Sequence, residues 1–329
     1  MAFAMKPRWL IHGALIVALA GLASSAWSQT QTSVGVPGRG NLAFGVQLQH
    51  VTITKRDLII VKETFGEVTL RSAWFSLDYG LTDRLALTAT LPYKSNRYIG
   101  DQPHDPRLLL NDHGQELLDN GQFHSNWGDF GLNLRWLWRT DPVAITPFIG
   151  YYTPSNDYPL FTETQAGRGQ WRVDAGFNAA GRLGKPAWNA YWQFGYAYSF
   201  MEKTHPSDAP ARRVNHSQLS VELGWRATPR LTPYITLNHV SPHNGMELPE
   251  FIGIPYSDQF YWHDQLLAWE FTTYSLGVSL DLPRQSAISM AYGRPLNVKF
   301  GHLYEPALSL SYSRGFSTNR SRGFPGNVD

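Results

Sequence analysis

Residues 129–138 read DFGLNLRWLW, and this stretch decides the fold of the chain. Its apolar side chains fall on every second position from Phe130 to Trp138, with mostly small or polar residues between them. A period of two is the pattern of a β-strand that buries one face in an apolar medium. Arg135 then lies on the opposite, polar face. Similar stretches recur along the chain, so we predict an all-β fold.

Twelve segments carry this alternation. They cover about residues 40–54, 67–79, 85–93, 127–138, 143–153, 171–182, 187–200, 215–226, 231–240, 266–282, 286–293 and 305–316. Bacterial single-chain barrels have an even number of strands, and a tilted strand needs about 9–11 residues to span a membrane. Twelve is an even number, and most of the segments match this length.

The connections between these segments alternate in length. Short turns occupy residues 81–84, 139–142, 184–186, 227–230 and 283–285, while longer loops occupy 94–122, 155–170, 201–214, 241–265 and 294–304. Transmembrane barrels have tight periplasmic turns and long extracellular loops, whereas a soluble sandwich has no reason to sort them. We therefore predict an antiparallel up-and-down transmembrane β-barrel of about 12 strands, with both termini in the periplasm.

The composition agrees with a barrel. Aromatic residues make up 14% of the chain and charged residues only 16%, against about 25% charged in soluble domains. Mean hydropathy is −0.30, and no apolar run of about 18 residues follows the N-terminal segment, which excludes a helical membrane protein. Aromatic residues stand at both predicted interfaces: Tyr79, Trp138, Trp188 and Trp225 on the periplasmic side, and Tyr93, Phe130, Tyr151, Trp171 and Tyr198 on the outer side.

The N-terminal segment is typical of a secretory signal peptide. Lys6 and Arg8 precede the apolar run Leu10–Leu22, and small residues follow as far as Ser28. We assign residues 1–28 to the signal peptide, 29–316 to one barrel domain and 317–329 to a polar tail. The chain has no Cys, which excludes lipoprotein anchoring, and its mature part is formally neutral, which gives no reason to expect a nucleic-acid partner.

The last predicted strand closes on Phe316, and such an ending resembles the signal that the barrel-assembly machinery reads. We expect this machinery, outer-membrane lipid and lipopolysaccharide as partners, and the outer membrane of a Gram-negative cell as the location. Charges on the polar faces must point into the lumen, since a charge facing lipid costs about 2–4 kcal/mol at the membrane midplane. The predicted lumen-lining residues are Arg135, Arg172, Asp174, Arg182, Glu222 and Asp281.

The predicted outer loops carry most of the histidines. They and the outer strand ends hold His50, His104, His113, His124, His205, His216, His239, His243, His263 and His302. A metal site with nearby aspartates is one interpretation, but no compact ligand spacing supports it, and solvated loops or lipopolysaccharide contacts are favoured. We predict no metal and no cofactor. A short helix is expected at Leu108–Leu118. It either folds over or into the barrel mouth or, as we favour, lies solvated at the surface.

One patch favours an enzyme instead. His239 and Ser241 share a strand face, which is the lipid side, and the spacing resembles the His-x-Ser arrangement of outer-membrane phospholipases and lipid A deacylases. A hydrolase also needs a group that orients the histidine, for which Glu247, Glu250 or Asn215 are candidates. Pro242 departs from the spacing in those enzymes, so we favour a protein without enzymatic activity and leave the hydrolase open.

Two stretches resemble an outer-membrane family named for the meta-pathway of phenol degradation. They are DYGLTDRL at residues 78–85, followed by LPY at 91–93, and WGDFGLNL at 127–134. The resemblance implies an outer-membrane protein for small-molecule uptake and no catalytic residues. We expect a channel or transporter for small molecules, including hydrophobic or aromatic ones. The alternatives are an exterior-facing lipid hydrolase and a non-conducting structural or adhesion barrel.

Overall fold

The computed structural model describes residues 38–54, 64–100, 104–185, 189–247, 250, 254, 256–299 and 306–318. The predicted signal peptide and nearly all of the polar tail lie outside the described residues. No helix in the described part of the chain is both long enough and apolar enough to cross a membrane.

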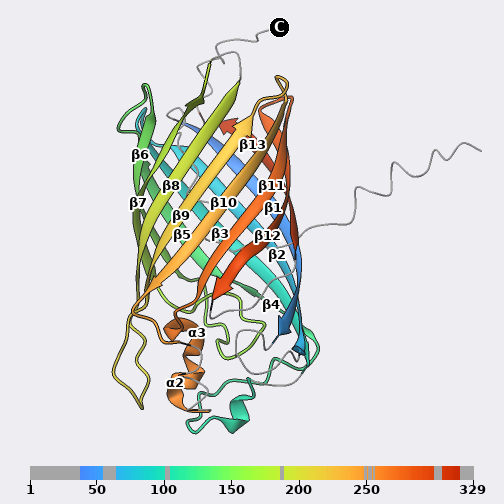
Figure 1. Cartoon of the computed structure of the whole chain (residues 1–329), viewed down its shortest axis with the longest axis vertical. Helices are drawn as coiled ribbons and strands as arrows, with labels where there is room; N and C mark the ends of the chain where they lie inside the picture. The colour runs from blue at the N-terminus through green and yellow to red at the C-terminus, as the bar shows by residue number, and fades with distance from the viewer. Residues whose placement is uncertain are drawn as a thin grey trace, which may run out of the picture.

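The described strands form one closed antiparallel sheet, seen from the side in Figure 1. They are β1 (Arg39–Thr54), β2 (Thr64–Gly80), β3 (Leu85–Gly100), β4 (Phe123–Trp127), β5 (Asp129–Trp136), β6 (Ala144–Pro154), β7 (Arg172–Leu183), β8 (Ala190–Met201), β9 (Asn215–Trp225), β10 (Leu231–His243), β11 (Glu270–Leu282), β12 (Ser286–Lys299) and β13 (Ala307–Ser317). β1 pairs with β13, which closes the barrel. β4 and β5 both pair with β3 and together make one barrel strand, so the predicted 12-strand barrel is confirmed.

A β-bulge at Gly128 separates β4 from β5. The register of β3 shifts by one residue between its pairing with β4 and its pairing with β5, so the bulged side carries one extra residue. The bulge places Trp127 on the outer face, where it is 41% exposed, and lets Asp129 face inward. A Cβ atom at Gly128 would lie 2.8 Å from the carbonyl oxygen of Ala166, so a loop passes close to the backbone at this point.

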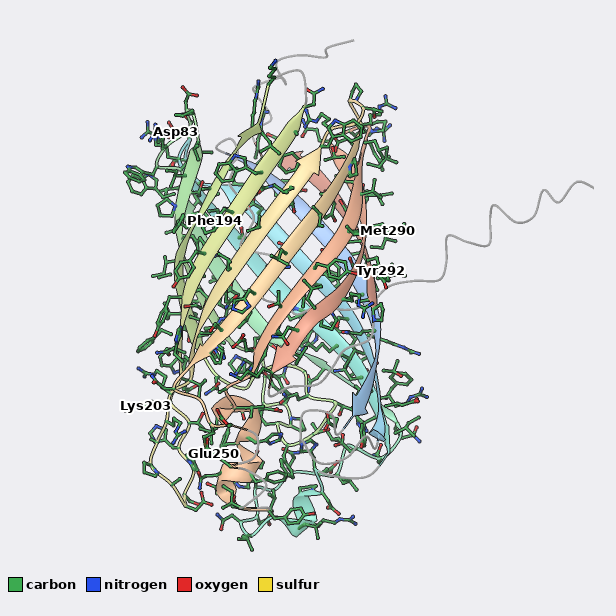
Figure 2. The ribbon with its side chains drawn as sticks, in the orientation of Figure 1. Asp83, Phe194, Lys203, Glu250, Met290 and Tyr292 are labelled. Carbon is green, nitrogen blue, oxygen red and sulfur yellow. The ribbon has the colours of Figure 1, made fainter. Side chains whose placement is uncertain are left out.

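Side chains alternate between the two faces of the barrel wall. On β5, Leu134 and Trp136 are 38% and 46% exposed, whereas Arg135 between them is fully buried. On β12, Met290 and Tyr292 point away from the barrel (Figure 2). An apolar outer surface around a polar interior is the arrangement of a barrel that spans a membrane.

The two ends of the barrel differ as the sequence predicts. The short turns gather at the upper end of the barrel in Figure 1, and the long loops gather at the lower end. In Figure 2, Asp83 lies at the short-turn end, while Lys203 and Glu250 lie at the long-loop end. Thr318 donates its backbone N–H to Gly38 at 2.9 Å, so the two ends of the barrel domain meet on the short-turn side.

The predicted helix at Leu108–Leu118 is wrong. The structure has one turn of 3-10 helix, η2 (Pro106–Leu108), and the following residues are irregular. The chain turns at Asp112, whose carboxylate accepts the backbone N–H of Gly114 at 2.7 Å, and Gly114 has a left-handed φ of 65°. This local turn ends any helix. The described α-helices are instead α2 (Asp258–Tyr261) and α3 (His263–Leu266).

Several strand boundaries also differ from the prediction, among them the following three. β3 continues to Gly100 and β12 to Lys299, because backbone pairing continues after the outward residues have become polar. The strand expected to begin at residue 266 begins at Glu270, because α3 occupies the preceding turn.

Candidate functional site

Arg135 lies fully buried on the inner face of β5. Its guanidinium donates to the carboxylate of Asp78 on β2 at 2.6 Å and to the hydroxyl of Thr88 on β3. Thr88 in turn donates to the same carboxylate oxygen at 2.8 Å. The network neutralises a charge that would be costly to bury alone.

Glu222 occupies the inner face of β9 and is held by three hydrogen bonds from its two neighbouring strands, β8 and β10. Tyr191 donates its phenol hydrogen to the carboxylate at 2.9 Å, Gln193 donates at 3.2 Å, and Thr236 donates at 3.4 Å. This carboxylate is therefore fixed by hydrogen bonds rather than by a cation.

Arg172 and Asp174 form a third interior pair, at the long-loop end of β7. The Nε atom of Arg172 lies 3.0 Å from a carboxylate oxygen of Asp174, and the guanidinium lies 4.0 Å above the ring of Tyr152. The pair is mostly buried. It places one positive and one negative side chain together on the inner wall just below the loops.

The six residues predicted to line the lumen divide into two groups. Arg135, Arg172, Asp174 and Glu222 lie inside the barrel, whereas Arg182 and Asp281 are exposed at the short-turn end of their strands. The alternation predicts the correct face for Arg182 and Asp281. Because both lie at the ends of their strands, however, they stand at the rim of the barrel rather than inside it. A water path along these residues stays a prediction.

The connection between β6 and β7, residues 155–171, folds inward and is called the mouth loop below. Asn96 on the inner face of β3 donates to the carbonyl oxygens of Thr164 and Gln165 at 3.5 and 3.4 Å. Asp129, which the bulge turns inward, accepts the Tyr158 hydroxyl and, at 3.1 Å, the backbone N–H of Arg168. The mouth loop is thus anchored to the inner surface of the barrel wall.

The far side of the mouth loop contacts α3 and the strand after it. Gln265 donates to the carbonyl oxygen of Arg168 at 2.8 Å, and Arg168 donates to the carbonyl oxygen of Asp264 at 3.2 Å. The Arg168 guanidinium lies 5.1 Å from the centroid of the Trp269 ring, which in turn lies 5.6 Å from the ring of His216 on β9. Burial lowers the pKa of Arg168 to about 10.

These contacts run across the barrel opening from β3 to β9. The two strands are five strand positions apart in a ring of twelve, so they lie on nearly opposite walls. The mouth loop and α3 therefore lie across the opening of the barrel at its long-loop end.

A histidine pair joins three loops at this mouth. His104, from the connection between β3 and β4, places its Nε2 atom 3.3 Å from Nε2 of His263 on α3. The Nδ1 atom of His104 lies 3.4 Å from Asp119 and 3.5 Å from Glu163 of the mouth loop. Burial alone lowers the pKa of His104, but these carboxylates and Asp264 outweigh it, so its pKa is raised.

His263 behaves in the opposite way. Its Nδ1 atom faces the carbonyl oxygen of Phe260 at 2.8 Å, so Nδ1 carries hydrogen and Nε2 accepts. Burial, with the charge of His104 beside it, lowers the pKa of His263. The arrangement fits a protonated His104 that donates to a neutral His263.

Two further loop contacts complete the cover of the mouth. His113 lies 2.7 Å from the Asp258 carboxylate, and its ring stacks on Tyr261 with centroids 3.6 Å apart. Asp208, from the connection between β8 and β9, accepts the backbone N–H groups of Asp258 and Gln259 at the start of α2. Four outer loops thus meet at α2 and α3.

Sequence reasoning found the loop histidines but missed the residues that organise them. Asp129, Arg168, Asp119 and Glu163 carry no local signal, because each acts through partners far along the chain. In the described part of the chain, no group of three or more His, Asp and Glu side chains is placed to hold a metal ion. The side chains of His50 and His302 are not among those that the structure describes.

The hydrolase candidates do not meet as the sequence suggests. The Nδ1 atom of His239 lies 2.9 Å from the hydroxyl of Thr272, and the described contacts include no hydrogen bond between His239 and Ser241. Glu247 uses its backbone N–H to bond Glu250, at the loop end. The predicted catalytic pair is therefore absent from the described contacts.

Another serine and histidine do meet on the outer wall. The Ser217 hydroxyl lies 2.9 Å from Nε2 of His243 and 3.1 Å from the Tyr196 hydroxyl. The ring of His243 stacks on Tyr198 at 5.6 Å. Among the described contacts no carboxylate or amide orients His243, so the third member that a hydrolase needs is not supplied.

Solved structures share this fold. The chain aligns with the crystal structure of an outer-membrane channel from Pseudomonas putida F1 at a TM-score of 0.62 and 15% identity, over 90% of this chain and 100% of that one. The translocator domain of the autotransporter NalP from Neisseria meningitidis aligns at 0.50 and 9%, over 85% of this chain and 88% of that one. No protein-family model and no curated protein sequence matches.

The fold, the apolar outer wall and these neighbours agree on the class of protein. The chain is an outer-membrane β-barrel. Its location is the outer membrane of a Gram-negative cell, as the sequence predicts. The resemblance to the phenol-pathway family holds at the level of the barrel fold, and membership of that particular family stays a prediction.

Proposed function

We propose that this protein is a selective outer-membrane channel for small molecules, hydrophobic or aromatic ones in particular. The observation that carries the proposal is the mouth loop, which Asn96 and Asp129 anchor on one wall while Gln265 holds it on the other side. A non-conducting adhesion barrel has no need to place a fixed loop across its own lumen. A narrowed mouth favours passage of small solutes over general diffusion.

The side chains at the mouth support the aromatic class of substrate. Phe161 and Phe260 pack edge-to-face at 5.5 Å, and Trp269 stacks on Phe271 at 4.8 Å. The Arg168 guanidinium lies against this second pair. Phe161 and Phe271 are buried within these pairs, so Phe260 and Trp269 are the rings left to contact a planar apolar molecule. The partly buried guanidinium of Arg168 adds affinity for a carboxylate or hydroxyl substituent.

Planar-bilayer conductance of the reconstituted protein tests the channel. Asp129→Ala removes the carboxylate that holds both Tyr158 and Arg168, so the mouth loop should loosen and the mean conductance should rise. Asp281→Ala, at the exposed periplasmic rim, is the matched control and should leave conductance unchanged. Absence of conductance in the wild-type protein and in both variants would refute the channel.

Liposome swelling tests the substrate class separately. We expect an aromatic carboxylate to enter faster than a pentose of similar mass, and we expect Arg168→Ala to reduce this preference. If the wild-type protein conducts ions but admits the two solutes at equal rates, the channel proposal stands and the aromatic selectivity is rejected.

A further inference from the structure

The outer wall changes from apolar to cationic at one level of β2 and β3. Phe75 and Leu77 on β2 are 42% and 41% exposed, and the next charged residue on the same face toward the loops is Arg71. On β3, Tyr93 is followed on its face by Ser95 and Arg97. Both arginines therefore point outward, beyond the apolar belt rather than into the lumen.

The two arginines share one aromatic ring. The guanidinium carbon of Arg71 lies 3.9 Å from the centroid of Phe123, and that of Arg97 lies 4.8 Å from the same centroid. Phe123 begins β4 and pairs directly with Arg97. Just below, Tyr93 and Trp127 pack edge-to-face at 5.0 Å and form part of the outer aromatic girdle.

The height of this cluster matches the membrane surface. Leu87 lies opposite Tyr79 of the periplasmic girdle, and Arg97 follows ten residues later on the same strand. Ten residues at about 3.3 Å each, on a strand tilted by about 40°, rise roughly 25 Å, which is the height of the apolar band of such barrels. Arg97 thus stands where outer-leaflet headgroups begin.

Within the described residues, neither arginine is in contact with a carboxylate. The next carboxylate toward the loops on this face of β2 is Glu67, and no described ion pair joins it to Arg71 or Arg97, although both guanidinium groups lie against one ring. Two like charges held this close repel each other, and an anion between them relieves the repulsion. Guanidinium groups match phosphate oxygens in a two-pronged geometry, and the ring beneath restricts their motion.

A third outward arginine lies across the barrel. Arg213, just before β9, places its guanidinium 3.9 Å from the ring of Phe200, which is 40% exposed and lies 6.1 Å from Trp171. Phe200 is next to the last residue of β8 at the long-loop end. The same combination of arginine and aromatic ring therefore recurs at the extracellular border.

We propose that Arg71, Arg97 and Phe123 form a binding site for a phosphate group of lipopolysaccharide in the outer leaflet. Phospholipid headgroups offer the same phosphate chemistry, but the cluster stands at the extracellular border, where the lipid of the outer leaflet is lipopolysaccharide. The site is separate from the mouth and does not depend on channel activity.

Lipid titration of the refolded, detergent-solubilised full barrel tests the site. The probes are diphosphoryl lipid A, dephosphorylated lipid A and phosphatidylglycerol, and bound lipid is counted by native mass spectrometry. Wild type should prefer diphosphoryl lipid A over both others. Arg71→Gln with Arg97→Gln should weaken that binding by about tenfold or more, because each charge-assisted contact contributes enough for such a change.

The matched control is Arg84→Gln with Arg139→Gln, which removes two exposed arginines at the short-turn end and should leave lipid A binding unchanged. Heat-dependent mobility on gels reports that each variant is folded. Phe123→Leu should weaken binding while both charges remain. Equal binding of lipid A by wild type and the Arg71/Arg97 variant would overturn the site. Equal affinity of wild type for phosphatidylglycerol would overturn the choice of lipopolysaccharide.

Discussion

Replacing His104 by alanine should open the extracellular mouth. The imidazole lies between the Asp119 and Glu163 carboxylates on one side and His263 on the other, and its ring packs edge-to-face on Phe161 at 4.9 Å. It therefore joins the connection between β3 and β4 to the mouth loop and to α3.

The size of the effect depends on the hydrogen bonds that Asp119 keeps after His104 is replaced. Asp119 is almost fully buried, but it keeps hydrogen bonds from the Thr162 hydroxyl at 2.7 Å and from the backbone N–H of Glu163 at 3.1 Å. The loss is therefore that of one buried charge-assisted contact, about 2 kcal/mol, rather than that of an unpaired carboxylate. Two kcal/mol raises the open fraction of the loops by roughly 30-fold.

The same pair makes the closed mouth depend on pH. The pKa of His104 is raised in the closed form, so its stabilisation is fully present below about pH 6.5 and is lost as pH rises through the raised pKa. The pKa of His263 is lowered, so its contribution is present above about pH 6.5 and is lost as pH falls toward the lowered value. Closure should therefore be strongest between about pH 6.5 and the raised pKa of His104.

Amide hydrogen exchange of residues 160–165, corrected for intrinsic rates, measures this opening. In the wild-type protein these amides should be most strongly protected between about pH 6.5 and the raised pKa of His104. In His104→Ala their protection should be roughly 30-fold lower, and it should no longer decline as pH rises through that pKa. His205→Ala, an exposed histidine of the connection between β8 and β9, is the control. Unchanged protection in His104→Ala, or a flat pH profile in wild type, would refute the reasoning.

Three further predictions concern the barrel topology, the charges on its inner wall and the serine–histidine contact on its outer wall. A cysteine at Asn156 should react with an impermeant maleimide on intact cells and one at Asp83 should not; equal labelling would contradict the assigned orientation. Arg172→Glu or Arg135→Glu should shift reversal potentials toward cation selectivity by changing the interior charge, and unchanged potentials would place both residues away from the ion path. Purified protein should release no fatty acid from phospholipid, and release that vanishes in Ser217→Ala would reveal a hydrolase instead.

The barrel wall was predictable because its signal is local. Alternation along β5 depends only on which medium each face contacts, so Leu134 and Trp136 indicate lipid whatever the rest of the chain does. The same alternation put Arg135 inside. It said nothing of Asp78, its partner, because that contact joins residues 57 positions apart.

The loops were harder to predict for the same physical reason. Helix propensity favoured Leu108–Leu118, yet an Asx turn at Asp112 and the binding of Gln115 to the mouth-loop backbone gave that segment another conformation. Nothing in residues 155–171 alone indicates that they fold inward. Their path depends on Asn96 and Asp129, which belong to other strands.

The strand number and the two faces of the barrel wall could be read from the sequence, because a period of two reports directly on the medium beside each strand. The loops that cover the mouth, the meeting of His104 with His263 and the serine that meets a histidine became evident only in the folded barrel. Those features depend on distances between segments far apart in the chain. Such distances are fixed only when the barrel closes and brings opposite walls together.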